Sequence, residues 1–423
     1  MEKLLTKNIH LPDSHKIETY RATGGYKALA KALGEYSPED IIDIVKRSGL
    51  RGRGGAGFPA GVKWSFMPKG TERPKYLICN ADEGEPGTFK DRVILEKDPH
   101  QLLEGIIIAS YAIGAQQAYL YIRGEFNLAI QRCEAAIREA YEHNFLGQNI
   151  MGKYYSLDIL LPIGAGAYIC GEETSLMESI EGKKGWPRIR PPFPANRGLF
   201  GCPTTINNVE TLANVPHIIE RGVEWYTSIG TDKNHGPKLY CVSGPVKRPG
   251  VYELPMGTPL PEIIFDHAGG LFEGRQLKGV IPGGSSTPIL RPDEIQVNMD
   301  FDSLAKAGTM LGSAGIIVLD HTMCIVRSTL ILANFYHHES CGQCTPCREG
   351  TGWLENILHH IEEGHGRPGD TDLLIEICDN IMGNAICPLG DAAAMAIGPA
   401  VKKYRDEFDY HLTNKQCLPE TRK

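Results

Sequence analysis

The stretch "KYLICNADEGEPGTFKDR", residues 75–92, joins an apolar run to a polar loop rich in acids and glycine. Its first part, residues 75–81, is a short apolar run that predicts a buried β-strand. Ligands of open α/β sheets bind outside the carboxyl ends of the strands, so the loop falls where a ligand would lie. The polar side chains placed there are Asn80, Asp82, Glu83 and Glu85. They suit ribityl or ribose hydroxyls or a divalent metal, and a solvated turn is the alternative.

The segments that follow alternate between strand and helix patterns. Residues 118–123 and 157–163 are further apolar runs, whereas 99–113 and 126–143 read as helices. Such alternation implies right-handed crossovers and a mainly parallel sheet. We therefore expect an α/β domain over residues 1–235, with its N-terminal segment wrapped around it.

The rest of the chain has two other patterns. Residues 236–321 contain short β-type runs broken by Pro and Gly, with one helix-like stretch at 259–268, and so predict a small α+β module. Residues 322–423 lack strand patterns and predict a helical bundle. Its expected helices lie near 323–338, 348–363, 370–382 and 390–407.

Composition narrows the class of protein. The chain has 423 residues, 42% of them hydrophobic and 22% charged, as in ordinary soluble proteins of several domains. A net charge of −7 argues against nucleic acid as the main partner. The N-terminus has no secretory signal pattern, and no apolar run reaches the roughly eighteen residues of a membrane span. The twelve cysteines therefore suggest reduced thiols and metal ligands.

Three of those cysteines stand at three-residue intervals in "ESCGQCTPCREG", residues 339–350. Cys341, Cys344 and Cys347 are expected in the loop between the first two helices of the bundle. They are too close in the chain to pair readily as disulfides, but C-x2-C-x2-C provides three ligands of an iron–sulfur cluster or a zinc ion.

Cys387 is our choice for the fourth ligand. It lies between two helices and precedes Pro388, as cluster-binding cysteines often do. Cys378 occupies an apolar position within a helix, and Cys417 lies in a polar tail that we expect to be loose. Three clustered ligands and a distant one favour a cubane cluster, and zinc in the same four thiolates is the alternative.

A glycine-dense loop, "GLRGRGGAGFPAGVKWSF", spans residues 49–66. Glycines allow a backbone to approach a planar or phosphorylated ligand closely, and their N–H groups can form an anion site. The loop does not match the standard nucleotide-binding fingerprints, and a flexible surface loop is the alternative. Phe58 and Phe66 favour binding, because aromatic side chains can hold a flat ring.

Two more loops join this expected site. "GAGAYICGEETSLMESIEG", residues 164–182, follows the third predicted strand and offers Glu172 and Glu173 as acceptors, with Thr174 starting a helix. "TTINNVETL" contributes Asn207 and Asn208, whose amides can bind a heterocycle or simply cap the next helix. Together the loops predict one composite ligand site.

In chain order, the motifs resemble the flavin-bearing, NADH-oxidising 51-kDa-type subunit (the F subunit) of respiratory complex I, NADH:quinone oxidoreductase. They are "RGRGGAGFP", "CNADEGEPGTFKDR", "GAGAYICGEETSL", "PTTINNVETLANVP", "SGPVKRPGVYELP" and "ESCGQCTPCREG…ICPLGD". The resemblance covers about residues 20–410. It implies a Rossmann-like flavin and NADH domain, a β-grasp module of the soluble ligand-binding type and a helical bundle with a [4Fe-4S] cluster.

The resemblance also implies cofactors and contacts. FMN would contact Gly52, Arg53, Gly54, Gly55, Lys63, Asn80, Asp82, Glu83, Tyr168, Gly171, Glu172, Glu173, Asn207, Asn208 and Thr211. NADH would contact Phe58, Phe66, Glu85, Glu173 and Phe193. The cluster ligands would be Cys341, Cys344, Cys347 and Cys387, and no side chain need act as an acid or base because the flavin carries out the hydride transfer.

The implied partners are a small thioredoxin-like [2Fe-2S] subunit and a larger iron–sulfur subunit of the same complex. The chain would lie in the peripheral arm, on the cytoplasmic side of the inner membrane, and meet the membrane only through other subunits. The alternatives are a diaphorase subunit of an NAD-linked hydrogenase or formate dehydrogenase and, from another class, a zinc-bound nucleotide-sensing scaffold. One departure is Gly84, where many relatives have Ser, so we expect a side-chain hydrogen bond to be lost.

Overall fold

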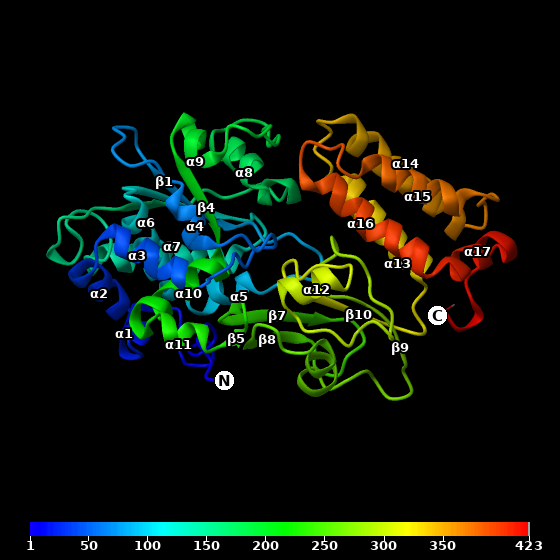
Figure 1. Cartoon of the computed structure of the whole chain (residues 1–423), viewed down its shortest axis with the longest axis horizontal. Helices are drawn as coiled ribbons and strands as arrows, with labels where there is room; N and C mark the ends of the chain where they lie inside the picture. The colour runs from blue at the N-terminus through cyan, green and yellow to red at the C-terminus, as the bar shows by residue number, and fades with distance from the viewer. Residues whose placement is uncertain (422–423) are drawn as a thin grey trace.

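A four-stranded parallel sheet forms the centre of the N-terminal part of the computed structural model, which describes residues 1–421 (Figure 1). Its strands are β1 (Tyr76–Ala81), β2 (Gln117–Ile122), β3 (Asp158–Leu160) and β4 (Thr204–Asn208). They lie in the order β3-β2-β1-β4, with Tyr76 of β1 opposite Gln117 on one side and Thr204 on the other. The predicted α/β class and the three predicted strands are confirmed.

The fourth strand was not predicted. Thr204, Thr205 and Asn207 give β4 a polar sequence, yet all three are buried beside β1. Hydrogen bonding to β1 and the cover of neighbouring helices, not apolar side chains, therefore account for this strand. Its position brings Asn208 to the same edge of the sheet as the loop after β1.

Helices cover the sheet. α6 (Pro99–Ile113) is buried at every position except Tyr111, and α10 (Val209–Arg221) packs against it. The other helices of this part are α1 (Ile17–Ala22), α2 (Lys27–Glu35), α3 (Pro38–Arg47), α4 (Ala60–Ser65), α5 (Asp91–Lys97), α7 (Asn127–Glu142), α8 (Glu173–Ile180), α9 (Pro194–Arg197) and α11 (Val223–Thr227). Short 3-10 turns are η1 (Ile150–Gly152), η2 (Tyr168–Gly171) and η3 (Leu199–Gly201).

The first residues of the chain reach the middle module. The backbone N–H groups of Leu4, Leu5 and Thr6 donate to the carboxylate of Glu253 at 2.7, 3.0 and 2.9 Å. Glu253 is buried, so the three hydrogen bonds satisfy a carboxylate that would otherwise be costly to bury. The N-terminal segment therefore joins the two parts instead of wrapping only the first.

The middle module is a second four-stranded sheet. Its strands, β7 (Pro237–Ser243), β8 (Gly250–Pro255), β9 (Leu277–Ile281) and β10 (Gly315–Asp320), lie in the order β8-β7-β10-β9. The helix-like stretch expected at 259–268 is a π-helix, η4 (Glu262–His267), and α12 (Phe301–Lys306) precedes β10. A two-stranded ribbon, β5 (Gly230–Thr231) with β6 (Asn234–His235), comes before β7.

The C-terminal part is helical, with one helix more than predicted. α13 (Ile325–Glu339), α14 (Thr345–Glu362), α15 (Asp370–Ile381) and α16 (Pro388–Lys403) form the bundle, and η5 (Pro419–Thr421) ends the described chain. The helix expected to run to residue 407 ends at Lys403, because Tyr404 leaves helical geometry and α17 (Arg405–Asn414) starts in a new direction. None of the helices that the structure describes has the length and apolar character to cross a membrane.

Candidate functional site

A cavity of about 390 Å³ opens where the three parts of the chain meet. The α/β part contributes the glycine loop, the loop after β1, η2 and the end of β4, while the other walls come from the middle module and α16. A cavity of this size, at a junction and at the carboxyl ends of parallel strands, suits a small-molecule ligand. The predicted residues that line it are Gly54, Gly55, Asn80, Asp82, Glu83, Glu85, Tyr168, Gly171, Glu172 and Asn208.

The glycine loop lets a ligand approach the backbone. Gly55 has a φ of +149°, and a Cβ built there would meet nothing within 4 Å. Gly54 instead lies against Asn208, whose Cβ would be 3.0 Å from an added Cβ. The loop is therefore packed on one side and open on the other, as a flat ligand lying against backbone requires.

Two acids of the loop after β1, the partly exposed Asp82 and the buried Glu83, have raised pKa values. Burial raises the pKa of Asp82 to about 7, and Arg123 only partly opposes it. Burial also raises the pKa of Glu83 to about 7, although its carboxylate accepts the backbone N–H groups of Lys90, Asp91 and Arg92 at 2.9, 2.9 and 3.1 Å. Glu83 thus shapes the loop that forms the cavity wall.

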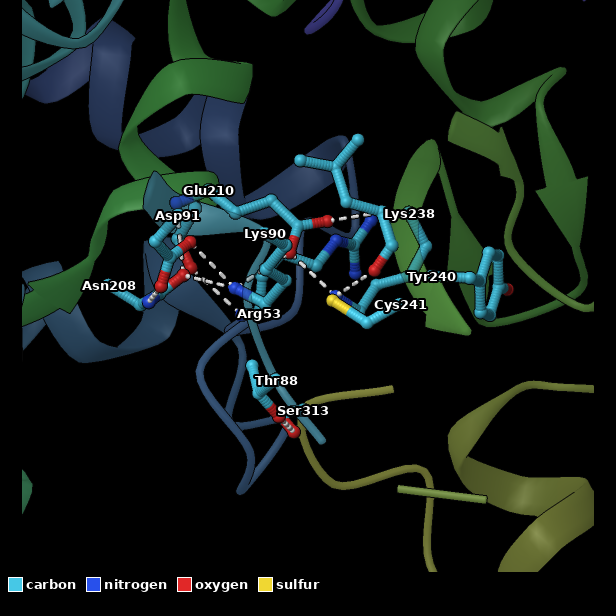
Figure 2. A network of polar contacts seen from close by, with 12 residues as sticks. Arg53, Thr88, Lys90, Asp91, Asn208, Glu210, Lys238, Tyr240, Cys241 and Ser313 are labelled. Carbon is cyan, nitrogen blue, oxygen red and sulfur yellow. Dashed lines mark hydrogen bonds and ion pairs between the residues drawn. The ribbon is translucent and has the colours of Figure 1, made fainter. Parts of the chain in front are cut away.

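Lys90 is a cavity residue that the sequence analysis did not single out. Figure 2 shows it between Asp91, Asn208 and Glu210, and its Nζ lies 2.7 Å from Asp91 and 3.0 Å from Glu210. Burial alone would lower the pKa of Lys90, but the two carboxylates raise it above its ordinary value. Lys90 is therefore protonated, and Asp91 and Glu210 balance its charge.

The same network is continuous with the middle module. Glu210 accepts a hydrogen bond from Lys238 Nζ at 2.6 Å, and Asn208 donates to Asp91 at 2.6 Å (Figure 2). Lys90, Glu210 and Lys238 are all buried. Removing one member of such a set leaves an uncompensated buried charge, so the network fixes the cavity wall. Lys90 lies in the "TFKDR" part of the acidic-loop motif quoted above. That motif is the sequence signal from which Lys90 could have been predicted.

Glu85 connects the loop after β1 to η2 and to the middle module. Its carboxylate accepts the hydroxyl of Tyr168 at 2.5 Å and the backbone N–H of Ser286 in the middle module at 2.7 Å. Next to it, a Cβ on Gly84 would lie 2.8 Å from Arg123 Nη1 and 3.2 Å from the Tyr168 ring. The arginine and the tyrosine occupy the space of the expected side chain, so Gly84 permits a closer packing here.

Six other predicted residues lie outside the cavity lining. Arg53 is buried, with its guanidinium donating to the carbonyl of His235 at 2.7 Å and its backbone N–H to Thr211 Oγ1 at 2.8 Å. Asn207 accepts from Trp64 Nε1 at 2.9 Å, and the N–H of Gly52 donates to the carbonyl of Phe58 at 2.9 Å. These groups brace the loops that the cavity uses.

Lys63 and Glu173, the remaining two, pair with each other at 2.8 Å. Glu173 also pairs with Arg190 at 2.9 Å. Burial would raise the pKa of Glu173, but Lys63 and Arg190 together hold it below its ordinary value. Glu172 caps α8 by accepting the N–H groups of Thr174 and Ser175, so the helix begins at Glu173 rather than at Thr174.

The three predicted aromatic residues lie at the surface. Phe58, Phe66 and Phe193 are 48%, 55% and 55% exposed, which is unusual for phenylalanine. The Phe58 and Phe66 rings are 6.1 Å apart and tilted by 47°. Exposed aromatic rings beside a binding loop are typical of a site that takes a second, flat ligand.

The predicted cysteines gather at the start of two helices of the bundle. Cys341 lies in the loop after α13, but Cys344 caps α14 and Cys347 is in its first turn, so only part of the motif is in the loop. Cys387 caps α16, with Pro388 as the first helical residue. Burial, together with the neighbouring Cys341 and Cys347, raises the pKa of Cys387 to about 12.

These thiols fit a cluster better than a single ion. Ligands of a tetrahedral zinc with four thiolates stand about 3.8 Å apart, given bonds near 2.3 Å. Among the described residues, these cysteines do not form a set with ligand atoms within 4.8 Å of one another. A cubane cluster needs the wider separation, and its iron atoms would replace the protons of buried thiols. Cys378 is buried within α15, as predicted.

The cavity and the cysteines adjoin. Pro388, Leu389, Ala392 and Met395 of α16 line the cavity, and the helix begins directly after Cys387. A ligand in the cavity therefore lies against the same helix start that holds the fourth cysteine.

Comparison with family models gives three matches. Residues 45–217 match the Nuo51 FMN-binding domain, 238–318 match the SLBB domain, and 327–411 match the NADH-ubiquinone oxidoreductase-F iron-sulfur binding region. These ranges follow the order of the α/β part, the middle module and the bundle.

Curated relatives match over almost the full chain. The second NADH-quinone oxidoreductase F subunit of Rhizobium meliloti (strain 1021) is 56% identical over 98% of this chain and 99% of its own length. The NADH-quinone oxidoreductase F subunit of Mycobacterium tuberculosis (strain ATCC 25618 / H37Rv) is 50% identical over 96% and 92%. Among solved structures, an NAD+-reducing [NiFe]-hydrogenase in the H2-reduced state matches with a TM-score of 0.85 and 35% identity, covering 99% of this chain and 68% of that one.

Proposed function

The chain belongs to the family of NADH-quinone oxidoreductase F subunits, and from that membership we propose how its residues divide the work of binding and oxidising NADH. The predicted family is confirmed, as are the fold class and the cofactors FMN and a [4Fe-4S] cluster. The protein is an oxidoreductase subunit of complex I that oxidises NADH and passes electrons toward quinone.

FMN, when bound, takes up two electrons from a hydride donor and releases them singly, and this is the chemistry that the cofactor supplies. The chain's own contribution is to bind, orient and exclude water. We assign FMN to the cavity at the junction of the three parts. The observation that carries this assignment is that one cavity joins the glycine loop, the acidic loop and the start of α16 beside Cys387.

The wall residues suit a flavin. Open backbone at Gly55 accepts a flat ring, Asn80 and Asp82 offer hydrogen-bonding groups, and Lys90 in the lining is an ammonium donor held by Asp91 and Glu210. Asn80 is already oriented, since its Nδ2 donates to the carbonyl of Gly171 at 2.8 Å. The loops of the cavity are held in place by four residues outside its lining, Arg53, Lys63, Asn207 and Thr211. These residues contribute to FMN binding indirectly, by positioning the loop backbone.

NADH binds, in our proposal, between the cavity and the exposed aromatic rings. Phe58, Phe66 and Phe193 supply the apolar surfaces, and Glu85 lies on the nicotinamide side. Glu85 is held by Tyr168 and Ser286, which keeps its carboxylate fixed. Orientation of this kind is a large part of the barrier in a hydride transfer.

The cluster ligands in this proposal are Cys341, Cys344, Cys347 and Cys387. No three of these four thiols have their sulfur atoms within 4.8 Å of one another, which supports a cluster over the zinc-bound scaffold considered above. We also propose domain boundaries near residues 235 and 321. A small [2Fe-2S] subunit and a larger iron–sulfur subunit would be the partners, on the cytoplasmic side of the membrane.

Membership of a complex implies other subunits. The second candidate function is a diaphorase subunit of an NAD-linked hydrogenase or formate dehydrogenase. The structural match to an NAD+-reducing hydrogenase favours that candidate. The relatives at 50–56% identity are F subunits of NADH-quinone oxidoreductases, against 35% for the hydrogenase chain, and this difference favours complex I.

The test is electron transfer by the purified full chain loaded with FMN and iron. We expect it to pass electrons from NADH to ferricyanide but not to quinone, since no described helix spans a membrane. An Asn80→Ala variant should lose bound flavin and this activity, whereas Asn334→Ala on exposed α13 should retain both. Direct, inhibitor-sensitive quinone reduction by the purified chain, or full flavin in Asn80→Ala, would contradict the proposal.

A further inference from the structure

A second set of potential metal ligands lies at the other end of the bundle. Cys324, Glu362, His411 and Cys417 each offer one ligand atom, and these four atoms lie within 4.8 Å of one another. Among the described residues no other set of three or more His, Cys, Asp or Glu residues has this spacing. The set is separate from the flavin cavity and from the cysteine motif.

The four residues come from four segments of the helical part. Cys324 caps α13, Glu362 ends α14, His411 lies in α17, and Cys417 follows α17. Figure 1 shows α17 and the C-terminus beside the bundle end where α13 starts. The tail that was expected to be loose is therefore held, and Cys417 packs against the core of the bundle.

Two polar atoms of this set are buried and make no hydrogen bond. His411 is 0% exposed, and its Nδ1 makes no hydrogen bond. Glu362 Oε2, 3.7 Å from that nitrogen, also makes none. A buried polar atom without a partner costs about 1–3 kcal/mol, so two neighbouring ones need an explanation.

Two pairs of donor atoms in this set also lie as close as the ligands of one ion. His411 Nε2 is 3.4 Å from Cys324 Sγ, and Glu362 Oε1 is 3.7 Å from Cys417 Sγ. Ligands of tetrahedral zinc stand about 3.3–3.8 Å apart, given bonds of 2.0–2.3 Å. Both separations fall within this range.

We propose that Cys324, Glu362, His411 and Cys417 bind one structural zinc ion. Two thiolates with an imidazole and a carboxylate are a tetrahedral donor set of the kind that zinc prefers, whereas magnesium and calcium take oxygen ligands. All four positions are filled by side chains, so the ion has no open site for a substrate. Its role is to join α13, α14, α17 and the tail.

The ion is independent of the cluster. Cys347 and Glu362 lie near opposite ends of α14, and fifteen residues of α-helix separate them by about 22 Å. Zinc content and iron content can therefore be changed separately. This inference does not rest on the proposed flavin site, and each can fail without the other.

The experiment is metal analysis of the full chain carrying its flavin and cluster, after passage over a chelating resin. We expect about one zinc per chain, as for a closed structural site. Cys417→Ser and Glu362→Gln should lose it while keeping their iron and flavin. Cys202→Ser, a partly exposed cysteine in the α/β part, is the matched control and should keep zinc.

X-ray absorption at the zinc edge provides a readout that does not depend on folding of the variants. We expect two sulfur and two nitrogen or oxygen ligands at about 2.3 and 2.0 Å. A wild-type chain without zinc, equal zinc in Cys417→Ser, a shell of four sulfurs or a Cys324–Cys417 disulfide detected by mass spectrometry would each overturn the proposal.

Discussion

The two ends of the C-terminal bundle each gather cysteines, but the sequences that bring them together differ. At the cavity-facing end, three of the proposed cluster ligands lie within seven residues and the fourth caps α16. At the opposite end, the four ligands come from the start of α13, the end of α14, α17 and the tail. No three of the first four thiols lie within 4.8 Å of one another, as expected for the proposed cluster, whereas the second set lies within 4.8 Å, as expected for the proposed single ion. The distance between donor atoms, and not the number of cysteines, therefore distinguishes the proposed cluster site from the proposed zinc site.

The largest expected effect is loss of the cluster at the cavity-facing end of the bundle. Cys387→Ser should lose most of the cluster iron, because a cubane cluster needs four thiolates. Cys378→Ser, a buried cysteine of the same bundle, is the control and should keep its iron. Iron analysis and electron paramagnetic resonance of the reduced proteins measure the difference. Full iron in the Cys387 variant would refute the assignment.

The first of these ends was predictable, and the second was not. C-x2-C-x2-C is a local signal, so Cys341, Cys344 and Cys347 were found from spacing alone. Cys324 and Cys417 meet only because α17 turns back at Tyr404, a break that helical periodicity did not reveal. Whether residues far apart in the chain lie close together depends on how the helices pack, and a single sequence does not show that packing.

The same distinction holds in the flavin cavity. Loops after apolar strands were predicted, including Asn80, Asp82 and Glu83, because strand ends converge at one edge of a sheet. β4 was missed, since its Thr and Asn residues are untypical of buried strands. Lys90 was missed because its role depends on Glu210 and Asp91, which the fold supplies.

The second prediction concerns charge at the cavity-facing end. Acidic residues there should favour NADH over NADPH, because a carboxylate repels the additional phosphate. Glu173 is partly neutralised by Lys63 and Arg190, so Glu173→Gln should raise the relative efficiency with NADPH about tenfold. Steady-state kinetics with both nucleotides measure it, with Glu178→Gln on the same helix as the control. An unchanged ratio would mean that another group sets the preference.

The third prediction concerns the proposed zinc ion at the far end of the bundle. Removing zinc with a chelator should increase tryptic cleavage at Lys415 about fivefold, because the tail loses its tie to the bundle. Cleavage at exposed Lys233 in the turn between β5 and β6 should stay the same, as should the iron content. Mass spectrometry of the digests reports both sites. Equal cleavage at Lys415 with and without chelator would show that the ion does not hold the tail.

The smallest expected effect is a pH dependence at the cavity. The pKa of Asp82 is raised from 3.8 to about 7, so the folded chain binds a proton that the unfolded chain has released between those values. The stabilisation is complete below about pH 4 and is lost as the pH rises through about 7. Asp82→Asn stays neutral, so its unfolding temperature should fall less over this range than that of the wild type.

Thermal unfolding of the flavin-free chains between pH 4 and 7 measures the effect, which should amount to a few degrees. Asp293→Asn, at an exposed position, is the control and should follow the wild-type profile. Parallel profiles for wild type and Asp82→Asn would show that Asp82 is not the group that titrates.

The central claim is that this chain oxidises NADH at a flavin held in the cavity between its three parts. An anaerobic titration of the flavin-loaded full chain with NADH tests it most directly. We predict that the flavin absorbance falls as NADH is added and that flavin and cluster together consume about 1.5 NADH per chain, because the flavin takes up two electrons and the cluster one. A chain that binds FMN in full but whose flavin spectrum does not change on adding NADH would contradict the account.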